Sequence, residues 1–97
     1  MRNTISQAVR NKQVLTFTYD GYPRTVEPHC HGITTAGNEG LRCYQTAGGS
    51  SSGNVPGWHM MKVDKIIGLT VTQSVFSGPR PGYNPNDRGM STIFAQL

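Results

Sequence analysis

Cationic and aromatic side chains alternate in the middle of the chain, in a pattern that suits an anionic, ring-bearing ligand. Arg42 and Tyr44 fall on one face of a predicted strand over residues 41–45. The guanidinium of arginine donates a planar pair of hydrogen bonds to phosphate, and a tyrosine ring stacks on a nucleobase. Further residues of this kind lie on neighbouring predicted segments: Arg24, His29, Trp58 and His59. Together they predict a sheet face that binds a nucleotide or single-stranded nucleic acid.

The same residues also fit a purely structural interpretation, which stays open at this point. Tyr44 and Trp58 have the bulk of core residues, and Arg42 fits an ordinary surface cation. Nine Lys and Arg residues against five Asp and Glu residues give a net charge of +4. A basic domain favours anionic partners, but these basic residues are scattered along the chain, as solubilising charge also is.

A low-complexity loop, TAGGSSSGNVPG at residues 46–57, follows the predicted strand. Its flexible backbone amides and its hydroxyl groups, with Ser51 at the centre, suit the binding of an anion. The GGSSSG run lacks the Lys-Ser/Thr ending of a Walker phosphate loop. We therefore expect Ser51 to contribute to ligand binding but not to nucleotide hydrolysis of that type.

Three histidines and two cysteines raise the question of metal or nucleophilic chemistry. The spacing opposes a zinc site, because positions 29 and 31 share a strand face that position 30 does not, and no CxxC or HxxxH motif occurs. Cys30 and Cys43 fit small buried hydrophobic residues. A hydrolase that uses Cys30 or a histidine is the weakest alternative. We expect no catalytic residue, no metal and no cofactor.

Periodicity predicts a mainly β domain that begins with a short helix. Ile5, Ala8 and Val9 recur at helical spacing, after which apolar and polar residues alternate. Predicted strands span residues 14–19, 22–27, 29–34, 41–45, 58–63 and 67–72, with Asp20-Gly21 as a hairpin turn. One leading helix and about five short strands joined by tight turns are typical of a small barrel.

The C-terminal segment, residues 77–97, is distinct from the predicted sheet domain, residues 1–76. Residues 77–89 carry three prolines and three glycines and predict an extended arm, while residues 90–97 predict a helical turn or a strand. We expect the segment to pack on the sheet domain or on a second chain. Because Phe76, Tyr83 and Phe94 are too apolar for a solvated tail, a homodimer is the preferred expectation.

Length and composition limit the remaining possibilities. A chain of 97 residues is one domain with a thin core. No run approaches the ~20 apolar residues of a membrane span, and the N-terminal MRNTISQAVRNK is polar throughout, unlike a secretory signal. Two cysteines do not make a disulfide scaffold. A cytoplasmic protein without membrane contact is therefore expected.

The order and spacing of several short motifs resemble a WYL domain over roughly residues 4–70. The motifs are Ile5-x-x-Ala8-Val9 with Lys12, Phe17-x-Tyr19, Arg24-x-x-Glu27-Pro28-His29, Leu41-Arg42-Cys43-Tyr44-Gln45 and Trp58-His59-x-Met61-Lys62-Val63-Asp64-Lys65-Ile66. The resemblance implies an SH3-like, Sm-type β-barrel that senses negatively charged ligands, often attached to winged-helix repressors or to defence systems that target nucleic acids. The Trp-Tyr-Leu of the family falls on Glu39-Gly40-Leu41, and its later strand arginine and aromatic residue fall on His59 and Met61. The chain therefore resembles a divergent branch.

The residues and the resemblance together predict a non-catalytic module that senses or sequesters an anionic nucleotide or nucleic acid. Such a module would act in regulation or in bacterial or phage defence. The predicted ligand-binding residues are Arg24, His29, Arg42, Tyr44, Ser51, Trp58 and His59. The alternative is a protein-interaction module whose C-terminal arm docks on a nuclease or a repressor.

Overall fold

The first strands form an antiparallel meander whose first turn follows directly from the sequence. The computed structural model describes all residues from 1 to 97. Asp20 and Gly21 join β1 (Gln13–Tyr19) to β2 (Tyr22–Thr34), and both have a positive φ, 51° and 79°. Two successive positive φ angles give a turn whose twist matches that of the flanking strands. β2 then pairs with β3 (Glu39–Gly48), and β3 pairs with β4 (Gly57–Lys62).

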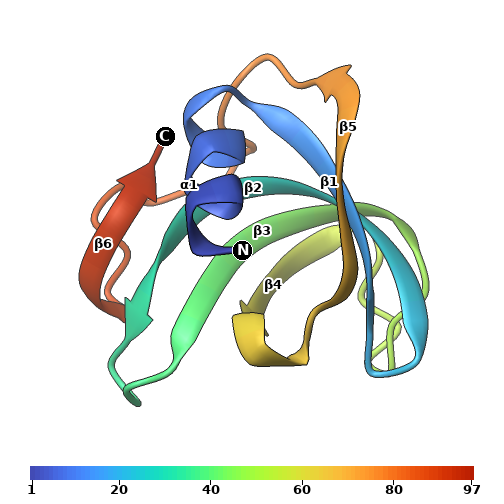
Figure 1. Ribbon diagram of the computed structural model, residues 1–97, viewed down its shortest axis with the longest axis horizontal. Coiled ribbons are helices and arrows are strands. Elements are labelled where there is room, and N and C mark those ends of the chain that lie inside the picture. The colour runs from blue at the N-terminus through green and yellow to red at the C-terminus, as the bar shows by residue number, and fades with distance from the viewer.

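The remaining elements complete a fold of six antiparallel strands and one short α-helix (Figure 1). α1 (Arg2–Arg10) precedes β1, and the 3-10 turn η1 (Val63–Lys65) follows β4. β5 (Ile67–Val75) returns beside β1, and β6 (Met90–Gln96) pairs with the second half of β2. The prediction of a mainly β fold with a leading helix is confirmed. α1 is too short and too polar to cross a bilayer.

The sheet is strongly curled, but its two ends are not paired with each other. β4 and β5 end the pairing order β4-β3-β2-β1-β5, yet only residues 63–66 join them. A flat sheet would hold these strands about 19 Å apart, which is farther than a connection built on one 3-10 turn reaches. The Lys62 backbone N–H donates to the Tyr19 hydroxyl at 2.9 Å, which ties β4 to β1 across the interior. A closed barrel is not confirmed.

β2 is one continuous strand, where the sequence predicts two short strands on either side of Pro28. Its first half pairs with β1 and its second half with β6, while β3 follows the other edge. The register against β3 shifts between Pro28 and Cys30. Proline lacks an N–H group and is tolerated at such an irregularity, so it bends the strand instead of ending it. β3 also continues to Gly48, into the predicted loop, and residues 90–96 form a strand.

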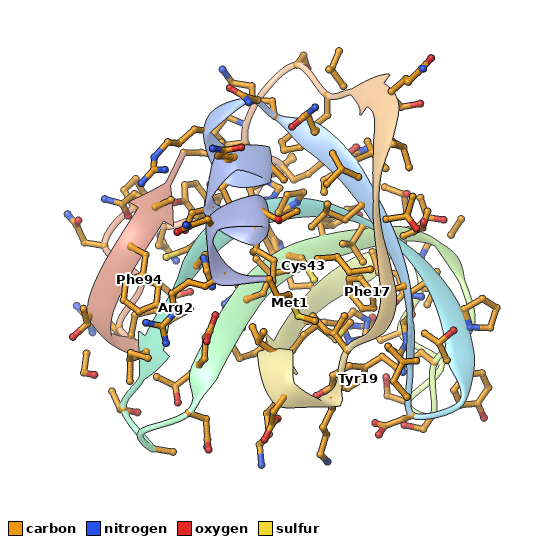
Figure 2. The ribbon with its side chains drawn as sticks, viewed as in Figure 1. Met1, Arg2, Phe17, Tyr19, Cys43 and Phe94 are labelled. Carbon is orange, nitrogen blue, oxygen red and sulfur yellow. The ribbon has the colours of Figure 1, made fainter.

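Apolar side chains on the inner face of the sheet form the core together with α1. Ile5, Ala8 and Val9 of α1 are fully buried, in agreement with their helical spacing. They belong to one cluster with inward-facing strand residues: Leu15, Phe17, Tyr19, Val26, Leu41, Cys43 and Met61. Figure 2 shows Phe17 and Cys43 in this interior, whereas Arg2 lies beside Phe94 on β6, 4.5 Å from its ring centroid. Because the inner face is filled, a ligand site has to lie on the outer face or at the rim.

Candidate functional site

The outer face of β2, β3 and β4 carries a row of side chains made by Glu27, Tyr44 and Trp58. Glu27 lies directly opposite Tyr44 on β3, and Tyr44 lies opposite Trp58 on β4. Directly opposed residues in antiparallel strands point to the same face of the sheet. The Tyr44 and Trp58 rings meet edge to face, with 5.4 Å between their centroids. The structure therefore brings these two predicted aromatic residues together.

The arm, residues 77–89, lies across this row and covers it. His29 is fully buried, and the rings of Trp58, Tyr83 and Phe76 surround it at centroid distances of 4.7, 5.2 and 5.6 Å. The Trp58 Nε1–H group donates to the Pro81 carbonyl at 3.2 Å. The face predicted to bind a ligand is partly occupied by the chain itself.

Arg80 is the main polar anchor of the arm. Its Nε and Nη2 groups donate to the two carboxylate oxygens of Glu27 at 2.7 and 2.9 Å, and its guanidinium carbon lies 4.9 Å from the Tyr44 ring centroid. The Arg80 backbone N–H donates to Nε2 of His29 at 3.1 Å, and Nδ1–H of His29 donates to the Glu27 carbonyl at 2.8 Å. An imidazole that accepts at one nitrogen and donates at the other is neutral. Burial favours this state, because it lowers the pKa of His29.

A second ion pair joins the far end of the arm to β3. Arg42 donates from Nε to Oδ2 of Asp87 at 2.7 Å, and from Nη2 to Oδ1 at 3.4 Å. The bond to Arg42 lowers the pKa of Asp87 below its usual value, so the carboxylate is charged at neutral pH. The Nη1 group of Arg42 makes no hydrogen bond within the chain and is free to donate to a ligand.

A cavity of about 620 Å³ opens between the second half of the arm and the sheet. Arg42 and Trp58 line it from the sheet, and residues 82–88 line it from the arm. Its volume lies within the usual range for small-molecule sites. Arg88, an exposed residue without a carboxylate partner, adds a second guanidinium. Trp58 and Tyr83 supply ring surfaces and stack on each other at 6.2 Å and 22°.

Two predicted site residues, Arg24 and His59, lie away from this face. Arg24 is 4% exposed and donates to the Tyr19 carbonyl and to the side chain of Gln45, at distances between 3.0 and 3.3 Å. His59 lies opposite the buried Cys43, on the face away from Trp58. Consecutive strand residues point to opposite faces. The expectation of a single shared face is therefore corrected for Arg24 and His59.

The serine-rich loop is closed on itself and does not line the cavity. The Ser50 and Ser52 hydroxyls lie 2.9 Å apart, and the Asn54 N–H donates to the Ser52 hydroxyl at 3.3 Å. The Nε2–H group of His59 donates to the Asn54 carbonyl at 2.9 Å. Ser51, in the middle of the loop, is exposed. The structure does not bring Ser51 together with Arg42.

A hydroxyl–imidazole–carboxylate relay beneath α1 has no counterpart in the sequence prediction. His31 donates from Nε2 to the Glu39 carboxylate at 2.8 Å, and the Ser6 hydroxyl donates to Nδ1 at 2.7 Å. Such a relay activates a serine nucleophile when the hydroxyl is open to a substrate. Here Ser6 is 5% exposed and His31 0%. The relay therefore fastens α1 to β2 and β3, and its one sequence signal is the position of Ser6 beside the apolar stripe of the helix.

Neither cysteine has the environment of a nucleophile. Burial raises the pKa of Cys30 to about 11 and that of Cys43 to about 12. The thiolate, which is the reactive form, is therefore scarce at neutral pH. Side chains of His, Cys, Asp and Glu form no group of three that could hold a metal ion. The Cys30 nucleophile considered from the sequence has no support in this environment.

The outer face gathers four of the seven predicted residues together with several that the sequence prediction left out. The predicted residues brought together are His29, Arg42, Tyr44 and Trp58. The arm adds Arg80, Tyr83, Asp87 and Arg88. No family model, curated protein or solved structure matches the chain. The function therefore rests on the chemistry of these side chains.

Proposed function

We propose that the protein binds a small anionic ligand of the nucleotide type in the cavity between the arm and the sheet, without chemical turnover. The observation that carries the proposal is that Arg42 and Trp58 line the same cavity of about 620 Å³. Arginine supplies hydrogen bonds to phosphate, and an indole ring supplies a surface for a base. A module of this kind senses or sequesters its ligand.

Charge and shape favour a ligand with few phosphates. Arg42 and Arg88 line the cavity with two positive charges and Asp87 with one negative charge, which leaves one positive charge uncompensated. The free Nη1 group of Arg42 can donate to a phosphate while Asp87 holds Nε and Nη2. Because the arm crosses the outer face, it blocks the path of a continuous single strand of nucleic acid along that face. A single nucleotide therefore fits this site better than single-stranded nucleic acid.

Quenching of Trp58 fluorescence measures the binding, since Trp58 is the single tryptophan. Arg42→Gln is expected to weaken binding of a nucleoside monophosphate at least tenfold, or about 1.4 kcal/mol, because a charge-assisted bond to phosphate is lost. Lys65→Gln is the matched control, because it removes a positive charge at an exposed position outside the cavity. Unchanged affinity in Arg42→Gln, or an equal loss in both variants, overturns the proposal.

Ionic strength separates a nucleotide from a strand. A ligand that pairs with one or two cations loses little affinity as salt rises, whereas a strand that pairs with many loses affinity steeply. We expect the shallow dependence for a nucleoside monophosphate. A steep dependence, measured with an oligonucleotide that binds more tightly, would identify single-stranded nucleic acid as the ligand.

We further propose that the curled sheet is the SH3-like, Sm-type barrel of a divergent WYL domain. We also propose that the protein works in the cytoplasm, in regulation or defence. The support is the sequence resemblance together with the strand order, in which β5 returns beside β1 after one 3-10 turn. Both cysteines are free and buried, which suits a reducing compartment. An experimental structure with a flat, open sheet would contradict the barrel.

The apolar residues that favour a homodimer make contacts inside the chain. Phe76 stacks on His29, and Phe94 meets His31 edge to face. The Tyr83 hydroxyl lies 3.4 Å from the carbonyl oxygens of both His29 and Leu97, within reach of its one O–H group. The dimer stays a prediction, which a light-scattering mass of one chain would contradict. The alternative of an arm that docks on a nuclease or repressor requires Tyr83 and the rest of the arm to leave their contacts with the sheet.

A further inference from the structure

Four residues of the outer face hold the Pro79-Arg80-Pro81 segment of the arm, and we call them the arginine strip: Glu27, His29, Tyr44 and Trp58. Both carboxylate oxygens of Glu27 accept hydrogen bonds from the Arg80 guanidinium, which lies over the Tyr44 ring. The backbone N–H of Arg80 donates to Nε2 of His29, and the carbonyl of Pro81 accepts from Nε1–H of Trp58. The strip therefore contacts both the side chain and the main chain of the segment.

This set of contacts is selective for arginine in a proline-flanked backbone. A bidentate bond to a carboxylate requires a planar fork of donors, which lysine lacks. A residue that precedes proline is restricted to extended conformations, so Arg80 before Pro81 loses little freedom on binding. With the arm in place the Glu27 side chain is only 9% exposed, so the arm shields the Arg80–Glu27 pair from water and strengthens their hydrogen bonds. These properties are those of a site built around an occupant.

We propose that the arginine strip is a recognition surface for Pro-Arg-Pro peptide segments, with the arm as its intramolecular occupant and a Pro-Arg-Pro segment of another protein as its partner. Pro79 and Pro81 are exposed, so the prolines contribute by restricting the backbone, as they do in other proline-rich peptides that bind in an extended form. The surface goes beyond the nucleotide cavity, because Trp58 is the one strip residue that also lines that cavity. The tethered arm competes for the arginine strip at an effective concentration of about 1 mM. An external segment therefore binds the strip when the contacts of the arm with the strip are weakened.

The test measures binding of a labelled, acetylated peptide with the sequence of residues 77–84, SGPRPGYN, by fluorescence anisotropy. Arg80→Ala removes the guanidinium of the tethered occupant and so weakens the hold on the arm, although the backbone bonds to His29 and Trp58 remain. The Arg80 side chain is 41% exposed, and far-UV circular dichroism checks that the variant folds. This variant is expected to bind the peptide at least tenfold more tightly than the unmodified protein. Arg88→Ala, which removes an arginine of the same arm outside the strip, is the matched control and is expected to bind as weakly as the unmodified protein.

Two further changes test the chemistry of recognition. Glu27→Gln in the Arg80→Ala background keeps the shape of the side chain but removes its charge, and is expected to lower the affinity at least tenfold. Replacing the arginine of the peptide by lysine is expected to do the same. A folded Arg80→Ala variant that binds no more tightly than the unmodified protein overturns the proposal, and so does binding that is insensitive to both changes. Arg80→Gln repeats the test if the alanine variant fails to fold.

Discussion

His29 and His31 lie two positions apart on β2 and are both fully buried, yet they lie under different covers. The arm seals His29 on the outer face, whereas α1 and β6 enclose His31 on the inner side. Nε2 of His29 accepts an N–H group from Arg80, so a proton on this nitrogen breaks the bond. Nε2 of His31 already carries its proton and faces the Glu39 carboxylate, which stabilises a positive charge.

The difference shows that the two covers are held by different interactions. α1 is held by fully buried apolar side chains, Ile5, Ala8 and Val9, which are continuous with the core. The arm is held at one end by the Arg80–Glu27 ion pair and at the other by the Arg42–Asp87 ion pair. The arginine of each pair is partly exposed. A partly exposed ion pair contributes less than the burial of three core side chains, even where the arginine binds both carboxylate oxygens. The arm is therefore the weaker cover and the part of the molecule suited to open for a ligand.

The largest effect that sharpens this comparison is expected from truncation of one side chain of α1 and of Phe76, which stacks on His29 next to the arm. Ile5→Ala is expected to lower the free energy of unfolding by about 3 kcal/mol, because it leaves a cavity in the core. Phe76→Ala, at a half-buried position beside the arm, is expected to lower it by about 1 kcal/mol. Urea denaturation followed by circular dichroism measures both values. Equal losses would contradict the ranking of the covers.

A smaller effect is expected from the relay beneath α1. Ser6→Ala leaves Nδ1 of His31 without a donor in a buried position, which is expected to lower the free energy of unfolding by about 1–2 kcal/mol. Ser77→Ala, at an exposed serine of the arm, is the control and is expected to change it by less than about 0.5 kcal/mol. If the two variants are equally stable in urea, the relay does not fasten the helix.

Acid is expected to lower the free energy of unfolding gradually, without a single step. Burial lowers the pKa of both His29 and His31 below 6.5, so the unfolded chain binds protons near that pH while the folded chain resists them. The free energy of unfolding is therefore at its full value above pH 6.5 and falls as the pH decreases towards the folded pKa values. The slope is at most about 1.4 kcal/mol per pH unit for each histidine. Urea titrations between pH 7.5 and 5 measure it.

His29→Gln separates the two histidines in this experiment. The glutamine oxygen can still accept the Arg80 N–H group but does not titrate, so the variant is expected to show a shallower pH dependence and constant Trp58 fluorescence on acidification. His31→Gln is the matched control. The free energy of unfolding of this variant is also expected to depend less on pH, but its Trp58 fluorescence is expected to change on acidification. If Trp58 fluorescence responds to acid equally in both variants, His29 does not link the arm to pH.

Local signals predicted most of the elements, because each depends on residues that are close in sequence. Asp20-Gly21 makes a turn with any pair of flanking strands, and the spacing of Ile5, Ala8 and Val9 fits one helix face. Alternation along residues 41–45 also placed Arg42 and Tyr44 together on the outer face. The same alternation, applied at Trp58, would have separated it from His59. The bulge after Pro28 was not predictable, because it arises from pairing β2 with β1, β3 and β6 together.

The sequence by itself determined the class of fold, the core stripe of the helix and the cation and aromatic chemistry of the strand at Arg42 and Tyr44. Only the tertiary structure decided which residues cover the side chains of Arg42 and Tyr44. The bonds from Arg80 to Glu27 and from Arg42 to Asp87 join residues 53 and 45 positions apart. No local pattern encodes such pairs, because they depend on the curl of the sheet and on the pairing of β6 with β2, which together fix both ends of the arm across the outer face.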